Sequence, residues 1–223
     1  MEFSNSSSDS QKFFIKNCSL AAIATGEKAN SLFELREKLS IIDESSLYYH
    51  FWGIRMNPRI LHTQHHNDFA TWAFHCLHDH ILAEKLTILD PTEFESLEDL
   101  RQELLETIDR RLDEYELILS TKKEDRFYFI RSMIIVFESS LTMSKPEDLP
   151  KILEKLSPGS IFYHFIDARS RNAEKVDDFS FWLKTFGNAY SVLIENIQSI
   201  DPYFLSLTEL REELLKVTKT FFQ

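Results

Sequence analysis

Two halves of this chain contain closely similar sequences. A repeated sequence predicts a repeated structural unit, and this constrains the fold before any single residue is considered. Comparison of the two halves also distinguishes polar residues that occur in both from those that occur in only one. The matching segments are 46–51 (SLYYHF) with 160–165 (SIFYHF), 68–72 (DFATW) with 178–182 (DFSFW), and 96–105 with 206–215.

The spacing of these matches defines the predicted domain organisation. His50 and His164 are separated by 114 residues, and the same separation relates Phe13 to Phe127. Between Trp72 and Trp182 the separation falls to 110. We therefore predict a disordered tail (1–12), repeat 1 (13–119), a polar linker (120–125) and repeat 2 (126–223). The two repeats are expected to pack as one globular unit.

Composition and charge argue against a nucleic-acid-binding protein, an all-β fold and a membrane-spanning protein. The chain has 223 residues, a net charge of −11 and only 4 glycines. The negative charge disfavours binding to nucleic acid, and few glycines disfavour an all-β fold. No apolar stretch is long enough to span a membrane, and the serine-rich N-terminus does not resemble a signal peptide. We therefore expect a cytoplasmic protein. We expect no disulfide framework, because there are only 2 cysteines.

Hydrophobic periodicity predicts four helices in each repeat. In repeat 1 they cover 31–42, a segment from about Ser45, a long helix over 67–86 and one that starts at Ser96. Asn67, Ser96 and Ser206 are expected to be N-caps. The apolar segments 13–24 and 127–137 fit a buried strand or a buried helix, and we prefer a strand. The predicted fold is mainly α, with two tandem pseudo-symmetric repeats of about four helices and at most one short strand each.

Four motifs occur in an order that resembles a known family. They are ATGEKANSLFEL at 24–35, SLYYHFWG at 46–53, NDFATW at 67–72 and LAEKL at 82–86. The chain resembles a prokaryotic family of domains of unknown function, number five-seven-five-two, over nearly its whole length. This resemblance implies no particular reaction or ligand. Glu27 stands where the pattern has a basic residue. Thr25-Gly26 is interpreted as a turn, with a tight turn beside a ligand as the alternative.

Polar and aromatic residues found in both copies have two interpretations. The structural one, which we prefer, makes the histidines buried and hydrogen-bonded and the aspartates helix caps. The functional one brings Tyr49, His50, Arg55 and Asp68 together as catalytic candidates, with histidine as acid or base and arginine as anion ligand. The remaining candidate binding residues are Trp72, Tyr163, His164, Arg169 and Asp178.

Histidines are distributed unevenly between the copies, because repeat 1 has seven and repeat 2 has only His164. Their spacing suggests a second alternative, a zinc-type site of imidazole ligands. No cofactor is predicted from the motifs, and no HExxH or CxxC pattern supports this metal site. The candidate ligands are His62, His65, His66, His75 and His78.

The leading functional hypothesis is a cytoplasmic binding or regulatory module on a duplicated helical scaffold. It rests on the acidic composition and on the lack of a nucleotide-binding or nucleophile motif. Its partner would be a protein or a small molecule, not nucleic acid or a membrane. The alternative is an enzyme of the metal-assisted hydrolase type, with a site in repeat 1 around Tyr49, His50, Arg55 and Asp68. The sequence does not specify the oligomeric state.

Overall fold

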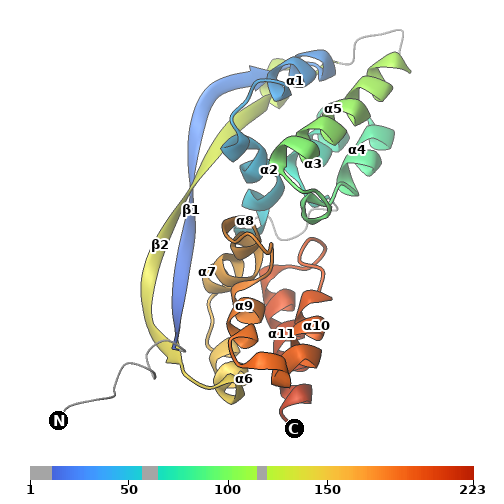
Figure 1. The fold of residues 1–223 in the computed structure, drawn as a ribbon. Helices are drawn as coiled ribbons and strands as arrows, with labels where there is room; N and C mark the ends of the chain where they lie inside the picture. The colour runs from blue at the N-terminus through green and yellow to red at the C-terminus, as the bar shows by residue number, and fades with distance from the viewer. Residues whose placement is uncertain (1–11, 57–64, 115–119) are drawn as a thin grey trace, which may run out of the picture. The chain divides into compact units, whose positions relative to one another are not determined.

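A computed structural model describes residues 12–56, 65–114 and 120–223. Two long strands run beside a series of helices (Figure 1). Between β1 (Phe13–Ala29) and β2 (Phe127–Met143) lie α1 (Leu32–Leu39), α2 (Glu44–Met56), α3 (Asp68–His75), α4 (His80–Thr87) and α5 (Leu97–Asp113). After β2 follow α6 (Leu149–Leu153), α7 (Pro158–Ile161), the π-helical turn η5 (Phe162–Asp167), α8 (Ala168–Arg171), α9 (Asp178–Lys184), α10 (Ser191–Gln198) and α11 (Leu207–Phe221).

The prediction of a mainly α repeat fold is wrong. Each strand has 17 residues, and β1 pairs with β2 in a two-stranded antiparallel sheet. The preferred strand assignment for 13–24 and 127–137 agrees with the structure, but the strands are central elements and not short additions. Aromatic and β-branched residues favour this extended conformation.

The strands are long because the Thr25-Gly26 segment does not end β1. Gly26 has φ +84° inside the strand, a conformation that glycine adopts without a steric penalty. The Thr25 hydroxyl donates to the Phe129 carbonyl at 2.7 Å and accepts from the Glu27 amide at 3.1 Å. The hydroxyl thus stabilises an irregular position typical of a β-bulge, and the interpretation of this dipeptide as a turn was wrong.

The chain forms two compact units that divide both strands. Unit 1 contains residues up to 19 and from 135 to 223, and unit 2 contains residues 20–134. The helices of unit 2 therefore contact the end of β1 and the start of β2. The helices of unit 1 contact the start of β1 and the end of β2. Each unit combines segments that are far apart in the sequence.

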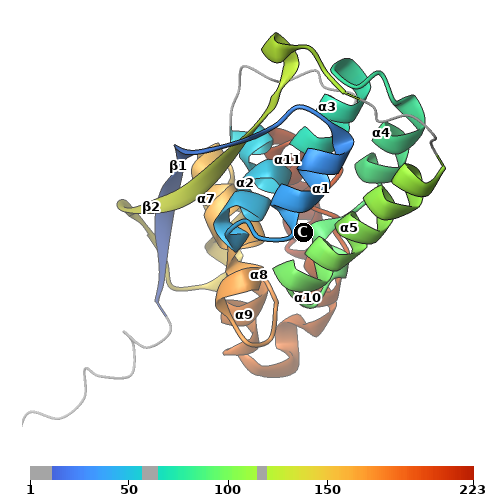
Figure 2. The ribbon, with the colours of Figure 1, turned by 90° about the horizontal axis from the view of Figure 1, so that it is seen from above.

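In unit 2, α5 is the helix around which the others pack. It contacts α1, α2 and α4, and α3 packs along α4 (Figure 2). Leu100, Leu104 and Ile108 lie on the inner side of α5 and are fully buried. The predicted N-caps are confirmed, because Ser96 accepts from the Asp99 amide and Asn67 from the Ala70 amide.

The predicted long helix over 67–86 is wrong, because the chain breaks between α3 and α4. His78 has φ +56° at the break. Asp79 then caps α4 by accepting from the Leu82 amide. Its buried carboxylate also receives two hydrogen bonds from Arg111, at 2.8 and 2.9 Å. The cap and this ion pair stabilise a break that no glycine or proline marks in the sequence.

In unit 1, α11 packs against α6, α7 and α10. The predicted N-cap Ser206 is confirmed, and with Glu209 it forms a complete capping box. The segment 177–197, which is the counterpart in repeat 2 of 67–86, is interrupted by a 3₁₀ turn at 187–190, where Gly187 has φ +74°. Leu210 and Leu214 of α11 are fully buried.

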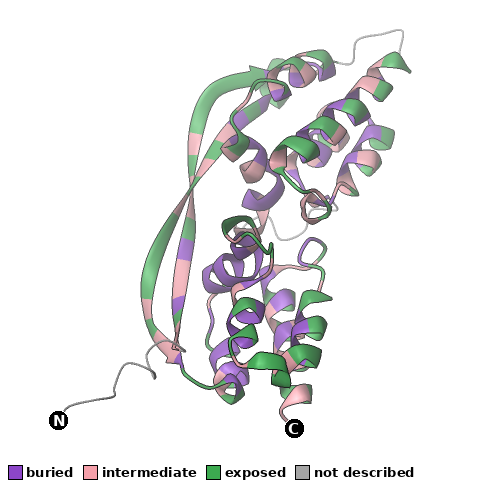
Figure 3. Ribbon diagram, in the orientation of Figure 1, coloured by how far each residue is buried: buried purple, intermediate pink, exposed green. Residues whose placement is uncertain are grey.

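Burial differs sharply between helices and strands. Buried residues gather on the inner sides of the helices, whereas much of both strands is exposed (Figure 3). Near the ends of the strands buried and exposed side chains alternate, with Phe127, Phe129 and Ile15 buried and Tyr128 and Phe14 exposed. Within the described residues, no helix combines the length and apolarity needed to cross a bilayer.

Helix α7 approaches β1 so closely that only glycine fits at position 159. A Cβ atom there would overlap the Asn17 side chain and the Cys18 carbonyl. Gly159→Ala is expected to lower the free energy of unfolding by about 2–4 kcal/mol, because a strand backbone must move. Chemical denaturation measures this loss. Gly26→Ala has open space around it, so its cost should stay near about 1 kcal/mol of backbone strain. Equal losses in both variants would contradict the close approach.

The N-caps of α3 and α9 differ in one side-chain atom, which is a nitrogen in Asn67 and an oxygen in Asp177. Asn67 and Asp177 are both fully buried and both accept from a backbone amide at 2.8 Å. Asn67 also donates from Nδ2 to the Leu86 carbonyl at 2.8 Å. The Oδ2 atom of Asp177 is buried and has no hydrogen-bond partner among the described residues. Burial therefore raises the pKa of Asp177.

Asp177→Asn is expected to stabilise the protein at neutral pH by about 1–2 kcal/mol, because it removes an unsatisfied buried carboxylate. The raised pKa means that folding favours the protonated acid, so the Asp177 contribution is fully favourable below about pH 4 and is lost as the pH rises. The advantage of the variant should shrink toward acidic pH. Urea denaturation at several pH values tests this, with the exposed Asp113→Asn as control. A pH-independent difference would refute it.

Candidate functional site

His50 on α2 connects helix and strand in unit 2. Its Nε2 accepts a hydrogen bond from the Ile130 backbone amide of β2 at 3.1 Å. Its Nδ1 lies 2.8 Å from Asp68 Oδ2 on α3. The ring is only 2% exposed and packs against Phe127 and Phe69. Since Nε2 accepts, the proton is on Nδ1 and is donated to Asp68.

His164 on η5 makes the same two contacts in unit 1. Its Nε2 accepts from the Lys16 amide of β1 at 2.8 Å, and its Nδ1 lies 2.8 Å from Asp178 Oδ2. The ring is 2% exposed and packs against Phe13 and Phe179. We call each histidine, with its aspartate and its strand amide, a histidine clamp.

The histidine clamps use both ring nitrogens of each histidine. A general base needs a free lone pair within reach of the substrate proton, and here a strand amide occupies that position. The geometry therefore favours the structural interpretation of His50 and His164. Among the other catalytic candidates, Tyr49 packs edge-on against His50, and Arg55 lies over the Trp52 ring at 5.5 Å. Burial and then the charge of Asp68 raise the pKa of Tyr49.

The candidate binding residues of repeat 2 surround an ion-pair network. Arg171, which sequence reasoning missed, donates to Asp178 at 2.9 Å and Asp167 at 2.7 Å, and it lies over the Tyr163 ring at 4.0 Å. Arg169 lies over Phe165 at 4.8 Å. These contacts hold η5 against α8 and the start of α9.

Trp72 also has a structural contact, because its indole Nε1 donates to the Asp125 carbonyl at 2.7 Å. The tryptophan is 5% exposed and packs edge-on against Phe127. It therefore holds the chain just before β2 against α3. The described candidates in this group make packing and hydrogen-bond contacts and do not line the cavities considered below.

Within residues 65–114, the candidate metal ligands do not converge. His65 is buried and its Nδ1 lies 2.7 Å from the Thr87 hydroxyl, while His75 and His78 are exposed. Burial and then the charge of His75 lower the pKa of His65. No group of three potential ligands, His66 included, forms in the described part of the chain. His62 lies outside the described residues.

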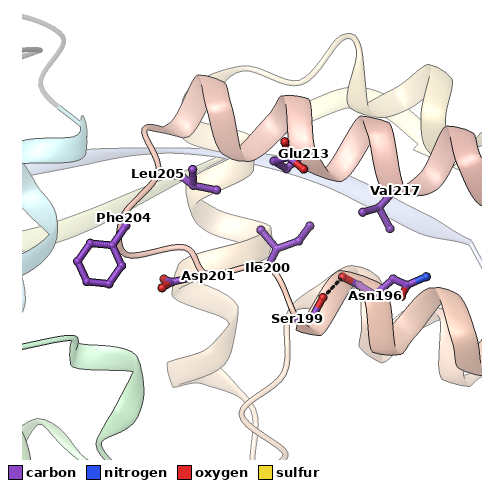
Figure 4. Close-up of a pocket in the computed structure, with 8 residues that line it drawn as sticks. All are labelled: Asn196, Ser199, Ile200, Asp201, Phe204, Leu205, Glu213 and Val217. Carbon is purple, nitrogen blue, oxygen red and sulfur yellow. Dashed lines mark hydrogen bonds between the residues drawn. The ribbon is translucent and has the colours of Figure 1, made fainter.

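Two corresponding grooves lie beside the final helices of the two units. The groove in unit 1 has a volume of about 480 Å³ and lies between α10, α11 and the loop that joins them (Figure 4). Its counterpart in unit 2 has about 210 Å³. Ile200 and Glu213 line the first groove, and Leu89 and Glu103 take equivalent places in the second. A groove that recurs in both units follows from how two such helices pack.

A third cavity, of about 390 Å³, lies in unit 2 between β1, β2 and the connection from α1 to α2. We call it the strand cavity. Four of its lining residues carry charge, and the others are small, apolar or hydroxylic. The charged residues are Glu27, Lys38, Asp43 and Arg131, and the rest are Ala24, Thr25, Ile41, Ile42 and Ser46.

The charged residues of the strand cavity have different partners. Lys38 pairs with Glu27 at 2.5 Å, and this raises the pKa of Lys38. Hydrogen bonds from Ser45 lower the pKa of Asp43, and the charge of Arg131 adds to the effect. Asp43 is therefore ionised at neutral pH. No described residue accepts a hydrogen bond from the Arg131 guanidinium.

The corresponding place in unit 1 has a direct contact between helix and strand. The charged residues Asp43 and Arg131 are replaced, at a separation of 114, by Ser157 and Asn17. The Ser157 hydroxyl donates to Asn17 Oδ1 at 2.9 Å, which connects α7 directly to β1. Glu27 and Lys38 are likewise replaced by uncharged Leu141 and Ile152. The four charged residues of the strand cavity are thus a feature of unit 2.

Sequence reasoning did not find the strand cavity. Its charged residues lie on four separate segments, and only the fold brings Arg131 near Asp43. The available signal was the loss of charge at four matched positions, three of them in repeat 2 and one, Asn17, in repeat 1. Thr25, beside which the sequence left a ligand as an alternative, lines the cavity.

Two helical units that share a pair of long antiparallel strands define the fold class of this chain. The chain belongs to the family of unknown function DUF5752, whose model matches residues 10–219. The sequence resemblance to this family is therefore confirmed. No curated protein matches the chain.

A solved structure has a closely similar fold. It is described as the structure of OrfY from Thermoproteus tenax and is 26% identical to this chain. The match covers 94% of both chains with a TM-score of 0.80. The architecture with two long strands is therefore shared with a relative across nearly the whole length.

His50→Ala is expected to lower the free energy of unfolding by about 2–4 kcal/mol, because it leaves a cavity and removes the acceptor for the Ile130 amide. Amide hydrogen exchange at Ile130 should accelerate more than exchange in α5. The exposed His75→Ala serves as control and should change stability by less than about 0.5 kcal/mol. Unchanged protection of Ile130 in the His50 variant would show that this histidine does not hold the strand.

Proposed function

We propose that the protein is a binding module for a small molecule and that the strand cavity is its binding site. The observation that carries the proposal is the contrast at four matched positions, which are charged in unit 2 and uncharged in unit 1, where Ser157 and Asn17 bond to each other. A purely structural role would be served equally well by the Ser157–Asn17 hydrogen bond. Four charged side chains around a cavity support a role in ligand recognition.

The dimensions of the strand cavity support a small ligand. About 390 Å³ falls within the range of small-molecule sites, which combine apolar walls with a few polar groups. Here Ala24, Ile41 and Ile42 supply the apolar part, and the charged residues supply orientation. A ligand bound at this place would contact α1, α2 and both strands at once. Such contacts are the basis for proposing a regulatory role.

Exchange of matched residues between the units provides a direct test. In Asp43→Ser/Arg131→Asn, unit 2 acquires the residues that fill the corresponding place in unit 1. The variant is expected to fold with unchanged stability and to lose ligand binding. Thermal unfolding in the presence of free amino acids, dipeptides, nucleosides and organic acids measures both properties. A ligand at about 100 times its dissociation constant stabilises the native protein by about 2.7 kcal/mol.

The matched control is Asp113→Asn/Lys123→Gln, which removes one charge of each sign at exposed positions outside the cavity. It should bind like the parent protein. If no compound of the panel stabilises the parent, or if the exchanged variant is stabilised equally, the proposal is refuted.

A further inference from the structure

We infer that the ligand of the strand cavity is a zwitterion, an α-amino acid or dipeptide with an apolar side chain. This inference rests on the proposed function and specifies the ligand class of the same site. It follows from the charges around the cavity, which include two of each sign. A ligand with a single charge would pair with one sign and gain nothing from the other.

Arg131 is the group suited to the ligand carboxylate. It projects from β2 into the lining of the cavity, and no described residue hydrogen-bonds its guanidinium. A free guanidinium fork binds a carboxylate through two parallel hydrogen bonds. Lys38 is less suited, because Glu27 already engages its ammonium group at 2.5 Å.

Asp43 is the group suited to the ligand ammonium. Ser45 donates to its Oδ1, from both amide and hydroxyl, and no described residue donates to Oδ2. The lowered pKa keeps the carboxylate charged at neutral pH. Asp43 therefore offers one pre-oriented oxygen to a donor in the cavity. An ammonium donor would make a charge-assisted hydrogen bond there.

The apolar residues that line the strand cavity indicate which side chain the ligand carries beside its ammonium and carboxylate groups. Ala24, Ile41 and Ile42 are apolar, and Ile41 is 76% exposed. An apolar side chain on the ligand would cover part of this surface and gain hydrophobic free energy. The ligand class thus combines an ammonium, a carboxylate and an aliphatic side chain.

Isothermal titration with L-leucine and with L-alanyl-L-leucine tests the inference. The matched probes are 4-methylpentanoate, which lacks the ammonium, and isopentylamine, which lacks the carboxylate. At least one zwitterion should bind about tenfold or more tightly than both probes. Arg131→Gln and Asp43→Asn should each weaken zwitterion binding by about tenfold, whereas Lys123→Gln and Asp113→Asn should leave it unchanged.

Each result separates this inference from the proposed function. If a compound of another class binds and the exchanged variant loses it, the cavity is a site and the zwitterion assignment is refuted. Equal binding of the single-charge probes would also refute it. If neither zwitterion binds in the titration, the zwitterion assignment fails, whereas the proposed function fails only if no compound of the thermal panel stabilises the parent. Circular dichroism of each variant establishes that lost binding is not lost folding.

Discussion

Both units depend on a buried histidine that accepts a hydrogen bond from a strand amide. His50 and His164 each hold a strand backbone against helices through Nε2, while an aspartate fixes the proton on Nδ1. A two-stranded sheet is marginally stable by itself, so its ends require such anchors. The aromatic residues Phe13 and Phe127 pack on the same histidines and exclude water from these bonds.

Once the histidine clamps fix the strands, small differences between the units determine what else can form. Where Ser157 bonds to Asn17, helix and strand close together. Where Asp43 and Arg131 take these places, the same framework leaves the strand cavity. The difference between the two units at this place thus follows from substitutions at the contact between a helix start and a strand, without a change in the clamp.

The sequence predicted local features well and long-range ones poorly. The caps Asn67, Ser96 and Ser206 depend on neighbouring residues and were predicted correctly. The break before Asp79 depends on Arg111, which is 32 residues away, and periodicity does not reveal it. The strand length was missed because Gly26 lies inside β1. The strand cavity was missed because Arg131 reaches it only through the pairing of segments about a hundred residues apart.

The division of both strands between the units determines what happens when the chain is cleaved into two fragments. Lys16 precedes and His164 follows the segment 120–125, and His50 precedes it while Ile130 follows it. A cut in that segment would give two fragments, each with a histidine but without the amide that it binds. Neither fragment would carry a complete set of its own contacts. The two halves would behave as complementary parts, and recovery of structure on mixing them would depend on concentration.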